Sequence, residues 1–440
     1  MNRWIGCLAA TASLGCTSSA LARDGRLDVS GSFRMRAEAI DGQYRAIAPA
    51  SDAVLLFRFD LSAVYTIGPV KIGGEMLDSR AYFERRNSSI GNNEVDTIEP
   101  VQVYVAADLG SGANLQAGRF TMDLGSRRLI ARPVSRNTVN AFTGVRLDWK
   151  SPGGDKLTAF WTMPQTRLPE DLDGIRDNRA VLDRERVERQ LFGAFGSKAG
   201  VLGGAAELYG YRFVERDAPG FATRNRRLWT IGARLVRAPK AGMVDYDGEG
   251  AWQSGTTRLG TNPADGPDHR VSAWMAHGAI GWTFRHRWSP RLALIGDYAS
   301  GDGPRSAYGR FDALVGATSF EFGPPGLYSL LARSNLASFA VRGEIKPTSR
   351  LDAYVAARPI WLASTTDSLS NSGVRDATGA AGSFVGTQID GRVRYWLAPG
   401  RLQFGAGVAT VFKGAFLRDA PNVPATGNTH FGYLDTTLSF

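Results

Sequence analysis

The chain has 440 residues, a formal net charge of +10 at pH 7 and 52 glycines, and 45 of its 52 basic residues are arginines. The most apolar uncharged stretch beyond the N-terminal segment, residues 271–284, has fourteen residues, whereas a membrane-spanning helix needs roughly 18 or more. Helical membrane spans are therefore excluded. No Pro/Ser-rich linker or shift in composition divides the chain, which favours one large domain.

The N-terminal segment has the three-part layout of a secretory signal peptide. Arg3 precedes an uncharged stretch of small and apolar residues, which ends in Ala20-Leu21-Ala22. We expect residues 1–22 to be removed and residues 23–440 to form the mature domain. A lipoprotein with Cys16 at its N-terminus is a weaker alternative, because Ser13-Leu14-Gly15 fits that cleavage pattern poorly. Both cysteines lie in the removed segment, so no disulfide is expected.

Polar and apolar residues alternate with a period of two along most of the mature chain. In residues 27–40 the apolar Val29, Phe33 and Met35 share one face, while Arg34 and Arg36 share the other. Such alternation is typical of a strand with one wet and one apolar face. By itself it fits a soluble sandwich and a membrane barrel equally well.

The lengths of the connections separate these two folds. The predicted strands are residues 27–40, 53–66, 70–83, 98–109, 113–121, 139–149, 157–163, 189–197, 202–213, 227–237, 242–253, 271–285, 291–299, 336–346, 350–362, 384–397, 401–412 and 430–440. Their connections alternate between short turns, such as 67–69 and 198–200, and long stretches, such as 164–188 and 300–335. We therefore predict a transmembrane antiparallel β-barrel of about 18 strands, with short periplasmic turns and long extracellular loops.

The C-terminal strand supports the same fold. Gly432, Leu434, Thr436, Leu438 and Phe440 share one face, and the chain stops on an aromatic residue. This ending resembles the signal by which the barrel-assembly machinery recognises its clients. We expect insertion into the lipid of the outer membrane of a Gram-negative bacterium.

Residues 117–149 read AGRFTMDLGSRRLIARPVSRNTVNAFTGVRLDW. This block resembles the signature of the alginate export family of outer-membrane channels. The matching positions are Gly118, Arg119, Gly125, Arg128, Leu129, Ile130, Asn137, Phe142, Gly144, Val145 and Arg146. Weaker matches are Asp78-Ser79-Arg80 and Tyr298-Ala299-Ser300-Gly301-Asp302, so the resemblance spans essentially the whole mature chain. It implies an outer-membrane channel for an acidic polysaccharide that works as a single barrel.

The chain also departs from the family pattern. Thr143 replaces an Asp, Ser135 replaces a Trp, and Ala398-Pro399-Gly400 stands where the alginate-secreting archetype has a long pore-closing loop. These departures put dedicated alginate secretion in doubt. Uptake of acidic sugars, or a general or phosphate-type anion porin, remains the alternative, and the direction of transport stays open.

The arginines are the candidate pore-lining residues, since their planar forks suit carboxylates and phosphates. Arg119, Arg128 and Arg146 are the leading candidates for the constriction. The others are Arg80, Arg392, Arg394, Arg34, Arg58 and Arg342, together with Asn137 of the family block. Carboxylates such as Asp60, Glu344 and Asp390 share the polar phase. For each arginine a structural role in the barrel wall is weighed equally, because large barrels fill their interior with arginine–carboxylate ladders.

Other classes of function find little support. The four histidines lie in no recognisable catalytic motif, and we expect no enzyme activity, cofactor or metal. The segment 171–174, Asp-Leu-Asp-Gly, faintly resembles a calcium loop but lacks the bidentate Glu, so a solvated outer loop is preferred. The signal peptide and the strand pattern argue against a nucleic-acid partner, despite a pI near 9.7.

Overall fold

The computed structural model describes residues 25–440 apart from 305, 318 and 371. The predicted signal peptide, residues 1–22, lies outside the described residues. The described chain forms eighteen strands: β1 (Gly25–Asp41), β2 (Ser51–Ile67), β3 (Val70–Tyr82), β4 (Asp96–Gly110), β5 (Ala113–Phe120), β6 (Phe142–Lys150), β7 (Lys156–Pro164), β8 (Arg189–Val201), β9 (Gly204–Glu215), β10 (Arg227–Arg237), β11 (Val244–Thr257), β12 (His269–Thr283), β13 (Arg291–Ala299), β14 (Leu336–Thr348), β15 (Leu351–Trp361), β16 (Phe384–Ala398), β17 (Leu402–Lys413) and β18 (Thr429–Ser439).

The strands close into one barrel. Each strand pairs antiparallel with the next, and β1 pairs with both β2 and β18, in a register that sets Ser32 opposite Ser439. Gly31 and Phe440 exchange two backbone hydrogen bonds of 3.0 Å at the seam. Closure satisfies every strand edge, which a bilayer requires. The predicted 18-stranded antiparallel transmembrane barrel is confirmed.

The period-two pattern sorts the side chains between the lipid and the lumen. On β1 the apolar Leu27, Val29 and Met35 are exposed on the outside of the barrel, while Arg36 and Glu38 are buried inside it. Large side chains such as Trp229 and Trp252 are also exposed on the outside. A polar interior with an apolar outer band is the arrangement of an outer-membrane barrel, because the outer face contacts hydrocarbon.

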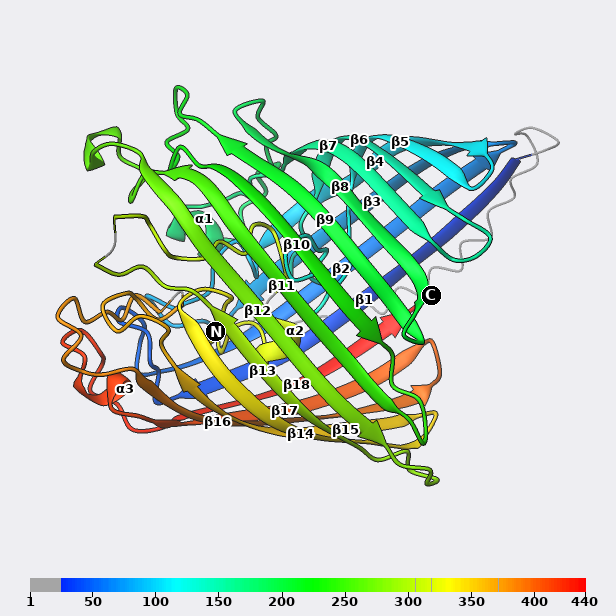
Figure 1. The fold of residues 1–440 in the computed structure, drawn as a ribbon. Coiled ribbons are helices and arrows are strands. Elements are labelled where there is room, and N and C mark those ends of the chain that lie inside the picture. The colour runs from blue at the N-terminus through cyan, green and yellow to red at the C-terminus, as the bar shows by residue number, and fades with distance from the viewer. Residues whose placement is uncertain (1–24, 305, 318, 371) are drawn as a thin grey trace, which may run out of the picture.

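The ends of the barrel differ, as Figure 1 shows: short turns lie at one end and long loops gather at the other. One turn is displaced from its predicted position, because β8 continues to Val201 and the turn is Leu202-Gly203. Both turn residues have a positive φ, 49° and 75°, and glycine adopts this conformation readily. β6 also begins at Phe142 rather than at residue 139, because Val139 and Ala141 of the preceding loop pack in a buried cluster with Leu77 of β3 and Val101 of β4.

The long loops carry short helical segments, namely α1 (Leu172–Arg176), α2 (Ser319–Phe322), α3 (Phe416–Asp419) and a 3-10 turn at Pro263–Asp265. None of the helices in the described part of the chain is long and apolar enough to cross a membrane. Asp171 caps α1 by accepting a 2.8 Å hydrogen bond from the Gly174 amide, and it pairs with Arg179. The segment that resembled a calcium loop thus starts a helix.

Candidate functional site

The loop between β5 and β6, residues 121–141, folds into the lumen. On one side it lies against the inner wall of β1 to β3. Arg34 donates to the Arg136 carbonyl (2.6 Å), Arg58 donates to the Val134 carbonyl (3.3 Å), and the Ser79 hydroxyl donates to the carbonyl of Asn137 (2.7 Å). Arg34, Arg58 and Asn137, three of the predicted pore residues, therefore anchor this loop to the wall.

Arg128 fastens the same loop to the opposite wall. Its guanidinium pairs with Asp247 (2.9 Å) and Glu249 (2.5 Å) of β11, and with Glu321 (2.6 Å) of a second loop. The side chain is only 1% exposed. Because β11 lies across the barrel from β1 to β3 in the strand order, residues 121–141 span the lumen.

The second inward loop is residues 300–335, and Figure 1 shows its helix α2 within the outline of the barrel. Arg358 of β15 donates to the Glu321 carbonyl (3.1 Å), and Gln388 of β16 donates to the Phe322 carbonyl (3.0 Å). On β1, the Glu38 carboxylate accepts from the Leu327 amide (2.9 Å). The sequence left open whether this loop enters the pore or covers its mouth, and the contacts place it in the pore.

The two loops pack against each other. Ile130 and Val315 form a parallel β-bridge, and Leu129, Ile130, Phe322, Leu327 and Tyr328 belong to one buried apolar cluster. We call the joined loops the lumenal plug. Burial and the positive charge of Arg128 lower the pKa of Arg333, in the plug, to about 10. The plug is a packed core inside the barrel, held to the wall by charged groups.

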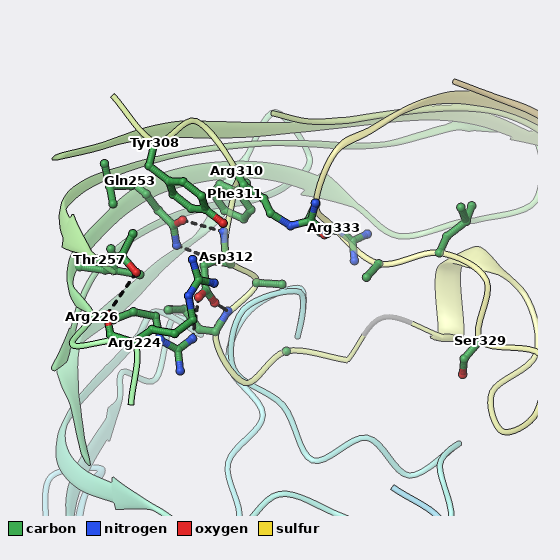
Figure 2. A pocket seen from close by; sticks show the side chains of 18 of the residues that line it. Arg224, Arg226, Gln253, Thr257, Tyr308, Arg310, Phe311, Asp312, Ser329 and Arg333 are labelled. Atoms are coloured by element: carbon green, nitrogen blue, oxygen red, sulfur yellow. Dashed lines mark hydrogen bonds and ion pairs between the residues drawn. The ribbon is translucent and has the colours of Figure 1, made fainter. Parts of the chain in front are cut away.

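Above the plug, on the side of the long loops, lie two adjoining cavities of about 320 and 260 Å³. Both are lined by Arg136, Arg226, Leu314 and Gly316. We call them together the outer vestibule. The larger also contains Arg224, Arg310 and Arg333, and Figure 2 shows Arg224 and Arg226 close to Asp312. The smaller contains Arg167 and Arg189, so seven arginines line the vestibule.

Three of these arginines have no ion-pair partner among the described residues: Arg136, Arg167 and Arg224. Arg136 and Arg167 both donate to the neutral Asn140 side chain (2.8 and 2.6 Å), and Arg224 lies over the Tyr308 ring. Burial and the positive charge of Arg167 lower the pKa of Arg136 well below its ordinary value. The vestibule therefore contains three guanidinium groups without an ion-pair partner among the described residues, and a bound anion would stabilise their charged form.

By contrast, the arginines singled out from the sequence are mostly paired. Eight of those nine form ion pairs: Arg119 with Glu99 and Glu185, Arg128 with three carboxylates, Arg146 with Asp148, Arg80 with Asp78, Arg392 and Arg394 with Asp352, Arg58 with Asp60, and Arg342 with Glu344. The ninth, Arg34, donates to the plug backbone. None of the nine lines the vestibule.

The nine arginines also differ in whether they face the lumen. Arg80 shares the phase of Ile72, Met76 and Tyr82, whose side chains are exposed on the outside of the barrel, so it does not face the lumen as expected. Arg146 lines a separate cavity of about 480 Å³ among β5 to β9. Arg342, Arg392 and Arg394 are partly exposed, at 21%, 30% and 38% of the side chain.

Strand periodicity could not find the vestibule arginines, because Arg136, Arg167 and Arg224 all lie in loops. One signal was available: Arg136 belongs to the family block 117–149 and directly precedes Asn137. A loop that folds inward places its side chains according to contacts with distant strands, and the local pattern carries no trace of these contacts.

The comparisons with known proteins agree with this geometry. The alginate export family model matches residues 25–431. The chain belongs to the alginate export family. No sequence among curated proteins matches it significantly. Similar solved structures include OccK8 (OprE) of Pseudomonas aeruginosa, at 13% identity and a TM-score of 0.58 over 94% of this chain and 98% of that one.

Two further structures are similar to the barrel. OccAB1 of Acinetobacter baumannii has 13% identity and a TM-score of 0.58, over 94% of this chain and 97% of its own. OpdK of P. aeruginosa, solved with vanillate, has 14% identity and a TM-score of 0.56, over 94% and 98%. At such identities the likeness concerns the fold. Together with the family match, it identifies an outer-membrane channel, and thus a transporter.

Proposed function

We propose that this alginate export family channel passes anionic substrates, with an acidic oligosaccharide or polysaccharide of the polyuronate type as the preferred cargo. The observation that carries the proposal is the group of three arginines that form no ion pair among the described residues, Arg136, Arg167 and Arg224, around the outer vestibule. A guanidinium binds a carboxylate through two parallel hydrogen bonds, and Arg is the residue best suited to such planar recognition.

Several arginines around two adjoining cavities also suit stepwise transfer. A polyuronate carries a carboxylate on each sugar, so one group can leave a guanidinium while the next one binds. Arg226 and Arg310 are already paired with Asp312 and Asp367, which keeps their hold on a substrate weaker. Conduction needs binding that is favourable enough to enter and weak enough to leave.

A second candidate is a channel for small anions, including phosphate. The volumes of the two cavities, about 320 and 260 Å³, favour it, because they lie at the lower end of the range for small-molecule sites. For a polymer to pass, the lumenal plug must move. The direction of transport is independent of this distinction.

Single-channel recording in planar bilayers tests the proposal. We expect anion selectivity and current block by oligouronates but not by neutral sugars, and competition between phosphate and oligouronates ranks the two candidates. Each charge-assisted hydrogen bond contributes about 1.5–3 kcal/mol, so Arg136→Ala or Arg224→Ala should weaken block by at least roughly tenfold. Arg216→Ala, at an exposed arginine outside the vestibule, is the control. An unselective current indifferent to uronates would refute an anion channel.

The biogenesis of the protein is also a matter of proposal. We propose that residues 1–22 are cleaved, that the barrel-assembly machinery inserts residues 23–440 as one domain, and that the channel works as a monomer. Phe440 directly follows β18 and bonds to Gly31 of β1, and this closure of a single barrel supports insertion as one domain and a monomeric channel. Intact and native mass spectrometry of protein extracted from membranes measures the start of the mature chain and the number of copies.

A further inference from the structure

Three buried carboxylates meet at the outer end of β4. Asp96 and Glu99 belong to that strand, and Asp183 belongs to the loop 165–188 between β7 and β8. One oxygen from each lies within 4.8 Å of the other two. Asp96 and Glu99 are each 1% exposed and Asp183 is 6% exposed. Burying three like charges together is costly unless a cation compensates them.

Asp96 is the member of the cluster whose carboxylate has no hydrogen-bond partner in the described part of the chain. Both of its carboxylate oxygens are buried and have no hydrogen-bond partner among the described residues. One of these two oxygens lies within 4.8 Å of a carboxylate oxygen of Glu99 and of a carboxylate oxygen of Asp183. The hydroxyl of the adjacent Thr97 is also buried without a partner. Buried polar groups are nearly always satisfied, so these unpaired oxygens are available to bind a ligand.

The positively charged side chains near the cluster already have other partners. Arg119 pairs with Glu99 and Glu185. Arg167 faces Asp96 and Asp183, but it donates its hydrogen bonds to the Asn92 carbonyl and to Asn93 and Asn140. In the described part of the chain no Arg, Lys or His nitrogen lies within 4.0 Å of a carboxylate oxygen of Asp96 or Asp183.

We propose that Asp96, Glu99 and Asp183 bind one calcium ion. Calcium prefers oxygen ligands at about 2.3–2.6 Å, so two oxygens on one ion lie up to about 5 Å apart, and the cluster fits within this limit. A second group, Asp247, His277 and Glu321, has similar spacing but is already neutralised by Arg128 and its neighbours. It is an ion-pair network rather than a metal site.

The ion would join the barrel wall to a loop. Asp96 and Glu99 are fixed in β4, whereas Asp183 lies in the segment that supplies Gln165, Arg167 and Glu170 to the outer vestibule. Within this loop the Leu168 amide already donates to Asp183 (2.8 Å), and the Asp183 amide donates to Glu99 (2.8 Å). Calcium would therefore hold one wall of the vestibule in place.

Calorimetry on the full chain in detergent micelles, after treatment with a chelator, tests the site with calcium alone. We expect one ion per chain, with a dissociation constant of about 10⁻⁴–10⁻³ M as in extracellular modules. Asp96→Asn and Asp183→Asn should abolish the binding. Asp171→Asn, at an exposed carboxylate in the same loop, is the matched control and should bind as the parent does.

A second measurement, hydrogen exchange on the parent protein, tests the site even if the variants fold poorly. In the parent, calcium should slow hydrogen exchange in residues 165–188, and magnesium should do so less. Absence of binding at millimolar calcium in the parent, or unchanged binding in both Asp96→Asn and Asp183→Asn, would overturn the proposal. Neither result depends on the substrate of the channel.

Discussion

Replacement of Arg128 by Met should release the lumenal plug without unfolding the barrel. Arg128 joins residues 121–141 to β11 and to Glu321 at the same time. Methionine keeps much of the apolar stem and removes the charge. The strand ladder, including the seam between β1 and β18, is untouched by the change.

The contacts left behind set the magnitude. Asp247 keeps Arg234 (2.7 Å) and Glu321 keeps Arg333. Glu249, itself 1% exposed, keeps hydrogen bonds from the Tyr209 hydroxyl (2.7 Å) and from Ser126 but has no other ion-pair partner in the described part of the chain. Removal of one partner of a buried ion pair costs about 3–5 kcal/mol. With a single carboxylate left uncompensated we expect the lower end, about 3 kcal/mol, which shifts the balance between plugged and open lumen by roughly 150-fold.

Planar bilayer recording and limited proteolysis measure this shift. We expect larger and noisier single-channel currents for Arg128→Met, and faster cleavage within residues 121–141. Adding Glu249→Gln should restore part of the parent behaviour, because the uncompensated charge is removed with its partner. Arg146→Met is the control, since Arg146 has one partner, Asp148, and lies outside the plug. Currents and cleavage like those of the parent in Arg128→Met would refute the plug as an ion-paired gate.

Two more predictions concern the loops. In Gly316→Ala the new Cβ would lie 1.8 Å from the Arg128 carbonyl oxygen, so the plug loops should separate and the conductance should rise. Gly427→Ala is the control, because there is open space around Gly427, and this variant should conduct as the parent does. Equal conductance in both variants would contradict the prediction. Burial raises the pKa of Glu94 to about 7, so this group stabilises its loop below pH 4.5 and loses about 3 kcal/mol of that contribution as the pH rises through 7. Hydrogen exchange in residues 85–95 should accelerate from pH 5 to 8 beyond its intrinsic pH dependence, and Glu94→Gln should abolish the excess; an excess that persists in Glu94→Gln would assign it to another group.

Much of the barrel was predictable from the sequence, because its wall obeys a local rule. A strand between lipid and lumen must alternate, and residues 27–40 do so. The pattern of short and long connections then gave the number of strands. The errors came where another interaction overrides alternation. Leu202-Gly203 forms a turn where the backbone has positive φ, and Val139 packs against Leu77 and Val101 of the barrel wall although it reads as strand.

The candidate site was predictable only in its chemistry. An excess of arginine over lysine indicated anion recognition, but the side chains that carry it in the vestibule, such as Arg136 and Arg224, lie in loops. Arg128 was selected for its place in the family block, and its burial depends on β11 and on residue 321, which are more than a hundred residues away. Partners so distant in sequence determine whether an arginine stabilises the wall or remains free for a ligand.

The position of the plug also makes the two entrances of the channel electrostatically different. The arginines without an ion-pair partner among the described residues, Arg136, Arg167 and Arg224, lie on the side of the long loops. Away from the vestibule, Arg342 pairs with Glu344, while Arg392 and Arg394 share the carboxylate of Asp352. A polyanion arriving from outside would meet arginines without an ion-pair partner before the plug, whereas one arriving from the periplasm would first meet arginines that are already paired with carboxylates. In a bilayer with oriented insertion, polyanions should act at lower concentration from the outer side, and small-ion current should rectify with the sign of the voltage.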